Sequence, residues 1–130
     1  MRPSELLPHR YPVFMLDTAE VVEKNRRAKG TRQVTMNDPL LLPGGTLPQV
    51  YVIESMAQIS GIASGRGGGS LFAAINGLSF SGPVRPGDTL EVESTVERNI
   101  GGLYSFTARA AVGGNIVAEG GILLHFDEGT

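Results

Sequence analysis

The chain has 130 residues, of which 41% are apolar, and this is enough for one domain with a buried core. A formal net charge of −2, from 11 basic and 13 acidic residues, gives no basic face of the kind that nucleic-acid binding needs. The chain has no cysteine and only two histidines, which excludes disulfides, thiolate nucleophiles and a zinc site of three histidines within one chain.

The first third of the chain predicts two short strands. They are expected at residues 18–23 and 29–36, which contain no proline and several β-branched residues. The basic residues Lys24, Arg26 and Arg27 lie between them. Because exposed runs of charge are usually solvated, this cluster predicts a hairpin turn rather than an anion site.

A loop and then a helix are predicted next. Residues 37–48 include three prolines and two glycines, which is typical of a loop. Residues 49–63 have no proline and carry apolar side chains on every side, which predicts a buried helix. Thr46 and Gln49 have the spacing of a capping box, and Pro48 suits the first helical turn.

Glu54 is the only charged residue in this predicted helix. A buried carboxylate is costly unless it is paired, protonated or turned toward a cavity. A structural partner therefore stays possible, and so does a catalytic or ligand-facing role. The start of the helix, residues 46–49, offers backbone N–H groups to a carbonyl oxygen. On their chemistry alone, His9 and His125 are interpreted as structural residues.

The rest of the chain predicts a sheet. The Gly-Arg-Gly-Gly-Gly run at residues 65–69 follows a helix, whereas nucleotide-binding glycine loops follow a strand, so we interpret it as a connector. Glycine turns separate the later strands and predict an antiparallel meander, with a polar outer row at Glu91, Glu93 and Glu97. The strands are expected at residues 70–80, 90–99, 103–112 and 116–126.

Three motifs carry a family resemblance. Residues 7–12 and 15–17 read LPHRYP and MLD, residues 53–58 read IESMAQ, and residues 79–88 read SFSGPVRPGD. Together they resemble the 3-hydroxyacyl-acyl-carrier-protein dehydratase family, FabZ/FabA-like, of the hotdog superfamily. The resemblance implies one hotdog domain over residues 1–130. Its class is α+β, with a central buried helix wrapped by a curved antiparallel sheet.

The resemblance also implies site residues and a mechanism. In the family, a histidine removes the α-proton of the substrate, and a helix carboxylate from the partner chain handles the departing hydroxyl. Backbone amides at the helix start hold the thioester carbonyl. Glu54 falls on the carboxylate, Gln58 lies one turn later and could orient it, and Gln49 replaces a helix-start glycine, so that its side chain narrows the pocket. The substrate-binding residues implied in this way are Leu41, Gly44, Gln49, Val50 and Gln58.

One position departs from the family pattern. Matching Leu42-Pro43-Gly44 to the family's F-P-G places Leu41 where the histidine belongs, in a loop that is one residue shorter. Leucine cannot accept a proton, so the sequence resembles a divergent branch of the family. His9 is then the other candidate for acid–base chemistry beside Glu54.

Three functions stay open. The leading hypothesis is a hydro-lyase acting on 3-hydroxyacyl chains of fatty-acid or related acyl metabolism; the others are an acyl-thioesterase and a catalytically silent, carrier-binding partner subunit. The resemblance implies no metal or organic cofactor, because the acyl chain is carried on phosphopantetheine. The expected partners are a second copy in a homodimer, with a hexamer as a trimer of dimers left open, and acyl carrier protein. We expect a cytoplasmic protein with no membrane span and no signal peptide.

Overall fold

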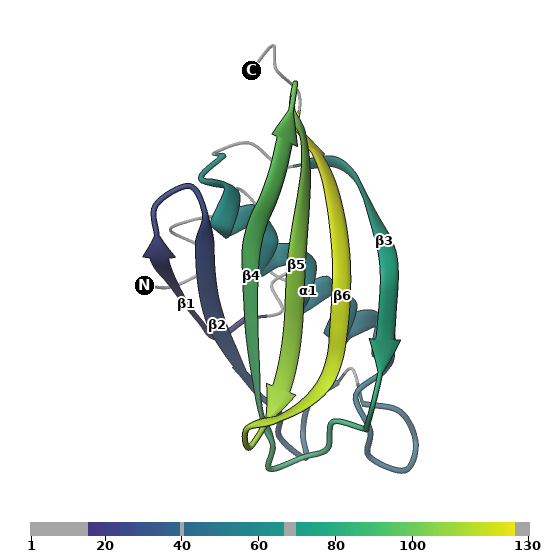
Figure 1. Ribbon diagram of the computed structural model, residues 1–130. Coiled ribbons are helices and arrows are strands. Elements are labelled where there is room, and N and C mark those ends of the chain that lie inside the picture. The colour runs from purple at the N-terminus through teal and green to yellow at the C-terminus, as the bar shows by residue number, and fades with distance from the viewer. Residues whose placement is uncertain (1–15, 40, 67–69, 127–130) are drawn as a thin grey trace.

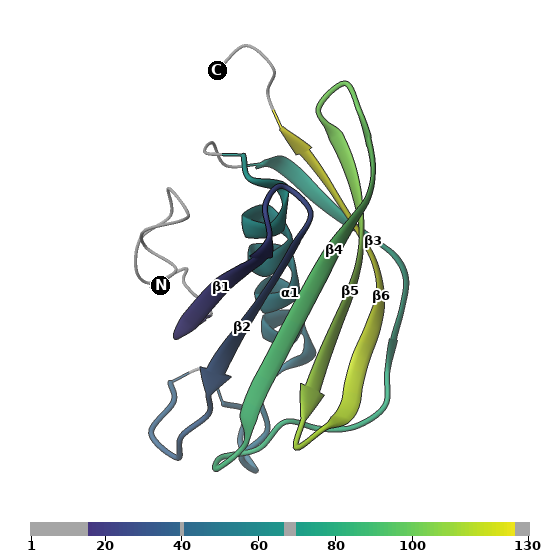
Figure 2. The ribbon, with the colours of Figure 1, turned by 60° about the vertical axis from the view of Figure 1, so that its left-hand side comes forward.

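The computed structural model describes residues 16–39, 41–66 and 70–126. It contains one helix and a six-stranded antiparallel sheet (Figure 1). The helix, α1, runs over Gln49–Ser64, and Figure 2 shows it against the concave side of the sheet. The strands are β1 (Thr18–Glu23), β2 (Arg27–Gln33), β3 (Ser70–Phe80), β4 (Thr89–Ile100), β5 (Leu103–Val112) and β6 (Asn115–Phe126).

The strand order is β1-β2-β4-β5-β6-β3, so the predicted meander is correct only from β4 to β6. β3 pairs with β6 at the far edge of the sheet, and β4 pairs with β2. The connection of residues 81–88 crosses the end of the sheet between β3 and β4. Long-range pairing within the sheet, rather than adjacency in the chain, therefore places β3 beside β6 and β4 beside β2.

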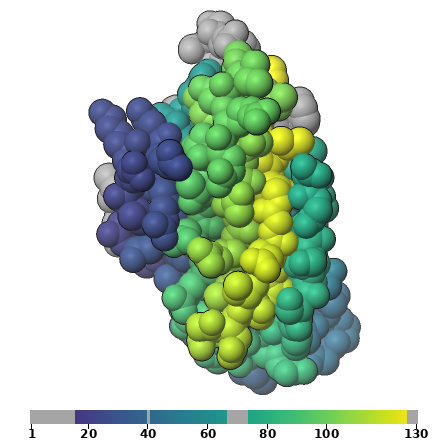
Figure 3. Space-filling view, in the orientation of Figure 1, coloured from purple at the N-terminus to yellow at the C-terminus, as the bar shows by residue number. Residues whose placement is uncertain are grey.

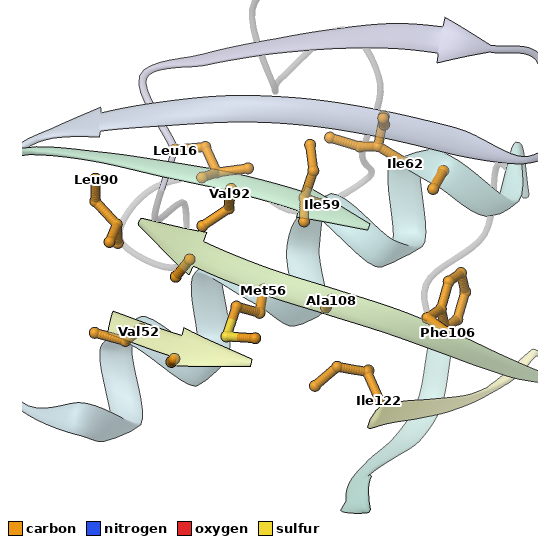
Figure 4. Packing of buried hydrophobic residues seen from close by; sticks show 14 of the residues in the cluster. Leu16, Val52, Met56, Ile59, Ile62, Leu90, Val92, Phe106, Ala108 and Ile122 are labelled. Atoms are coloured by element: carbon orange, nitrogen blue, oxygen red, sulfur yellow. The ribbon is translucent and has the colours of Figure 1, made fainter. Parts of the chain in front are cut away.

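The core lies between α1 and the inner face of the sheet (Figure 4). Leu90, Val92 and Ser94 of β4 point inward and are buried, whereas Glu91 and Glu93 point outward. This is the period-two alternation expected of a sheet with one covered face. The helix residues that complete the core are Val52, Met56, Ile59, Ile62 and Ala63.

Close packing of α1 on the sheet depends on a glycine in β2. A Cβ added at Gly30 would lie 2.5 Å from the backbone oxygen of Thr18 and 3.3 Å from Cδ1 of Ile59. Gly30 therefore permits the pairing of β1 with β2 and the approach of the helix at the same time.

Gly30→Ala is expected to lower the free energy of unfolding by about 1–3 kcal/mol, because β1 or α1 must move to admit the methyl group. Chemical denaturation of both proteins measures the difference. Gly82→Ala is the matched control, since a Cβ there would meet only Cγ1 of Val117, at an ordinary 3.9 Å. Equal stability of the two variants would contradict this packing.

Figure 3 shows the outer side of the sheet. Charges of opposite sign are paired across neighbouring strands on this side. Such cross-strand pairs favour the observed register. Burial raises the pKa of Glu93, but hydrogen bonds and charge from Arg27, at 2.6 Å, and Arg109, at 3.2 Å, outweigh it and hold this pKa below its ordinary value. One row across five strands contains Glu20, Lys29, Glu93, Arg109 and Glu119.

The predicted basic turn is only partly correct. Lys24 and Arg26 lie in the exposed turn between β1 and β2, but Arg27 is the first residue of β2. Its side chain forms an ion pair with Glu93 of the neighbouring strand β4. The cluster therefore divides between a solvated turn and a charge pair between strands.

The predicted capping box is wrong. Pro48 is the N-cap of α1, and no side-chain hydrogen bond caps the helix. Thr46 lies two residues before the N-cap, in a turn where its carbonyl oxygen accepts the N–H of Leu42. At its other end α1 stops at Gly65, whose φ of 72° is a left-handed conformation that glycine adopts without strain.

No described helix is long and apolar enough to cross a bilayer.

Candidate functional site

A groove of about 500 Å³ lies beside the start of α1. Its walls come from the loop before α1, the first turn of α1, the connection after β3, and β6. Figure 1 shows the helix start and the end of β3 at the same lower end of the molecule. The apolar wall includes Leu42, Leu47, Val52, Phe80, Val84 and Val117.

The groove is electrically neutral. None of the described residues that line it carries a charge, and only Thr46 and Gln49 contribute hydrogen-bonding side chains. Pro48 has no side-chain oxygen to accept from the first N–H groups of α1. The N–H of Tyr51 donates to the carbonyl oxygen of Pro48, and those of Gln49 and Val50 are left without an intrahelical acceptor. The groove therefore suits an uncharged, mainly hydrocarbon ligand with a carbonyl oxygen at its helix end.

Backbone hydrogen bonds hold the walls together. The N–H of Leu47 donates to the carbonyl oxygen of Val84 at 2.9 Å, and Ser81 N–H donates to Val117 at 2.8 Å. These bonds join the loop before α1 to the connection after β3, and that connection to β6. The groove is thus built from segments that come together only in the folded chain.

A buried ion pair fixes where the loop begins. Nη2 of Arg32 in β2 lies 2.5 Å from Oδ2 of Asp38, and the two side chains are 12% and 7% exposed. Further along, the N–H of Gly45 donates to the carbonyl oxygen of Leu42, which closes a tight turn through Gly44. The loop that carries Leu41 and Leu42 is therefore held at both ends.

The SFSGPVRPGD motif serves the groove by shaping its wall. Oδ2 of Asp88 accepts the N–H of Arg85 at 2.8 Å, and the N–H of Gly87 donates to Val34 at the end of β2. These contacts lock a compact turn that leaves Val84 buried beside the groove. The motif shapes the groove without contributing an acid or a base to its lining.

Only some of the predicted substrate-binding residues line the groove. Gln49 lines the groove, and beside it stands Leu42 rather than Leu41. Leu41 is half-buried and packs against the core. Gly44 is exposed at the tip of the loop, with a φ of 99°. The structure brings Leu41 and Gly44 near this wall but not into it, and their binding roles stay predictions.

Glu54 lies on an uncovered face of α1. The second half of α1, residues 58–64, is buried on every side as expected, whereas the first half is covered mainly on the face that carries Val52 and Met56. The opposite stripe contains Val50, Ile53, Glu54 and Ala57, with Val50 59% exposed and Glu54 exposed. Among the described residues no ion pair involves Glu54. Its carboxylate thus faces outward from a mainly apolar surface.

The other candidate site residues, Gln58 and the two histidines, do not line the groove or lie outside the described residues. Gln58 is buried one turn beyond Glu54, at 7% exposure. His9 lies outside the described residues, and His125 is half-buried in β6. Within the described part of the chain, no three His, Cys, Asp or Glu residues gather to form a metal site.

Sequence reasoning missed several residues of the groove wall. Val84 and Pro83 carried a signal, because they belong to the SFSGPVRPGD motif. Phe80 belongs to the same motif, whereas Val117 carried no signal, and both reach the groove through the long-range pairing of β3 with β6. Only the fold reveals that these two residues share a wall with Gln49.

Sequence comparisons indicate one family. The FabA-like domain family matches residues 7–121. The 3-hydroxyacyl-[acyl-carrier-protein] dehydratase FabZ of Thermomicrobium roseum is 41% identical, over 92% of this chain and 87% of that protein. Two solved structures share the fold at low identity. The dehydratase heterocomplex ApeI:P from Xenorhabdus doucetiae has a TM-score of 0.80 at 20% identity, covering 98% of this chain and 92% of that one. A hypothetical thioesterase with coenzyme A from Streptococcus pneumoniae TIGR4 has a TM-score of 0.68 at 15% identity, covering 85% and 87%.

Proposed function

The chain belongs to the FabA-like family, and from this premise we propose that it binds 3-hydroxyacyl thioesters on an acyl carrier protein and acts as a dehydratase-like lyase. The observation that carries the proposal is the neutral groove beside the start of α1, a helix start that no side chain caps. An acyl chain fits the apolar wall, and its thioester carbonyl accepts from the helix start.

The reaction removes water across one carbon–carbon bond. A base takes a proton from the α-carbon. The electron pair of the broken carbon–hydrogen bond then forms the double bond between the α-carbon and the β-carbon. The β-carbon–oxygen bond then breaks, and an acid supplies the proton that turns the leaving hydroxyl into water. We assign the acid to Glu54, with His9 as the other candidate for proton transfer.

The uncovered face of α1 supports a homodimer. Val50 of α1 is 59% exposed, and Glu54 lies in the same helix stripe as Val50, Ile53 and Ala57. Ile75, in the edge strand β3, is 50% exposed. A second copy over this surface would cover the apolar side chains and bring its own Glu54 toward a site that the single chain leaves incomplete. Assembly of such dimers into a trimer of dimers belongs to the same proposal.

Sedimentation of the purified protein at micromolar concentration is expected to show at least a dimer. Covering the apolar stripe on α1 removes its exposed area from water, which is the driving force for association. Val50→Glu should shift the equilibrium toward the monomer. Thr107→Glu, at an exposed site on the outer side of the sheet, is the control. A wild-type protein that sediments only as a monomer would refute the dimer.

The proposal requires no metal and no organic cofactor. The acyl carrier protein supplies the substrate through its phosphopantetheine arm, and the reaction needs only proton transfers and an oxyanion site. We place this activity in the cytoplasm.

A second function has a specific observation behind it. No titratable side chain lines the groove among the described residues. The motif match of Leu42-Pro43-Gly44 also assigns Leu41 to the position of the family histidine. The structural neighbour from Xenorhabdus doucetiae is a dehydratase heterocomplex, so a silent subunit that supports a histidine-bearing homologue is the alternative. A thioesterase is the third candidate, in which Glu54 would activate water.

Mass spectrometry of 3-hydroxyacyl-carrier protein after incubation with the purified chain separates the three functions. Loss of one water supports the lyase, and release of the acyl group as a free acid supports the thioesterase. An unchanged thioester that becomes dehydrated only when a histidine-bearing homologue is added, and faster than with the homologue alone, supports the partner subunit.

A further inference from the structure

The groove has polar side chains at only one end. Gln49 and Thr46 are the two hydrogen-bonding side chains among the described lining residues, and both stand at the start of α1. The rest of the wall is apolar or glycine. A ligand in this groove therefore meets hydrogen-bonding groups beside the helix and hydrocarbon elsewhere.

Both side chains are available to a ligand. Neither caps α1, and within the described part of the chain neither is engaged in a side-chain hydrogen bond. The carboxamide of Gln49 can donate and accept, and so can the hydroxyl of Thr46. With no charge on the wall, the matching group is a neutral one such as a hydroxyl.

We propose that Gln49 and Thr46 are specificity-determining residues that recognise the 3-hydroxyl of the acyl chain. This inference rests on the proposed binding of acyl thioesters and deepens it. The helix-start N–H groups take the thioester carbonyl, and the β-carbon lies only two atoms further along the chain. Its hydroxyl can therefore reach the side chains that flank those N–H groups. The groove would then prefer a 3-hydroxyacyl chain over the saturated chain of equal length.

Calorimetric titration with two small ligands tests this preference. The probes are a 3-hydroxyacyl-pantetheine and the matched acyl-pantetheine without the hydroxyl, each added to the full-length protein. Neutral hydrogen bonds contribute modestly, so the hydroxylated ligand is expected to bind about 2- to 10-fold more tightly per bond formed.

Gln49→Leu and Thr46→Val keep the approximate size of each side chain and remove its hydrogen bond. Each is expected to reduce the preference for the hydroxylated ligand while leaving the affinity for the saturated ligand near the wild-type value. Thr107→Val, on the outer side of the sheet, should change neither. If Gln49 and Thr46 only supported the structure of the groove, each substitution would change the affinities for the hydroxylated and the saturated ligand by the same factor.

Each result decides the proposal. Equal binding of the two ligands to the wild type, or a preference that survives both substitutions, would overturn recognition of the hydroxyl and leave acyl-thioester binding intact. Binding of neither ligand to the wild type would overturn both proposals.

Discussion

Glu54→Gln is expected to lower the rate of 3-hydroxyacyl dehydration about 10²- to 10⁴-fold, which is the usual contribution of a positioned acid or base. Glutamine has nearly the same shape as glutamate but cannot supply the proton that the leaving hydroxyl needs. Because Glu54 is exposed and outside the core, the substitution should leave the thermal unfolding temperature almost unchanged. Initial rates and a melting curve measure the two effects.

Glu91→Gln is the matched control for this experiment. Glu91 is also exposed, but it lies on the outer side of the sheet, away from α1. The same chemical change there should leave the rate near the wild-type value. Full activity in Glu54→Gln, or an equal loss in Glu91→Gln, would remove Glu54 from the mechanism.

Supplying a histidine beside the groove is the second change with a large expected effect. Leu41→His, together with one residue inserted to restore the loop length, is expected to raise dehydration about 10²- to 10⁴-fold over the wild type. Without the insertion the gain should be smaller, since a misplacement near 1 Å costs about 10²-fold. The rate of water loss from a 3-hydroxyacyl-carrier thioester is the measurement.

The structure supplies a comparison for this experiment. Leu42 lines the groove and is 50% exposed, whereas Leu41 packs against the core. Leu42→His therefore places an imidazole in the groove without disturbing buried packing. If neither histidine variant gains activity while both still bind the thioester, a missing base does not limit the reaction.

The wild-type base is tested in the same assay. His9→Ala should remove the residual dehydration if His9 supplies the proton transfer that Leu41 cannot. Asp38 is a poor substitute, because its carboxylate is buried against Arg32. Rapid wild-type turnover that is unaffected by His9→Ala would point instead to another side chain, with Tyr51 the next to replace.

Local patterns predicted the elements well, because each depends on residues that are close in the sequence. The helix expected at 49–63 is found at Gln49–Ser64, and the alternation in β4 correctly separated inward Leu90 and Val92 from outward Glu91 and Glu93. The resemblance also identified the hotdog fold correctly.

The failures all involve contacts between distant segments. The neighbour of β3 is β6 because of pairing across the whole sheet, which turn signals do not encode. The apolar character of α1 predicted burial on every side, which holds for residues 58–64 but not for the stripe of Val50 and Glu54 in the first half. Composition does not say whether such a stripe is covered by the same chain or by a second copy. The groove was missed for the same reason, since Phe80 and Gln49 meet only in the fold.

The central claim is that a groove at the start of α1 and a Glu54 from a second copy act on one acyl thioester. A crystal structure of the protein with a non-reactive 3-hydroxyacyl-pantetheine analogue tests it most directly. The account predicts the acyl chain in the groove and its carbonyl on the N–H groups of α1. It also predicts the Glu54 carboxylate of a second copy within about 2.6–3.2 Å of the hydroxyl oxygen. A ligand bound elsewhere, or one bound in the groove with the Glu54 of both copies facing solvent, would contradict the account.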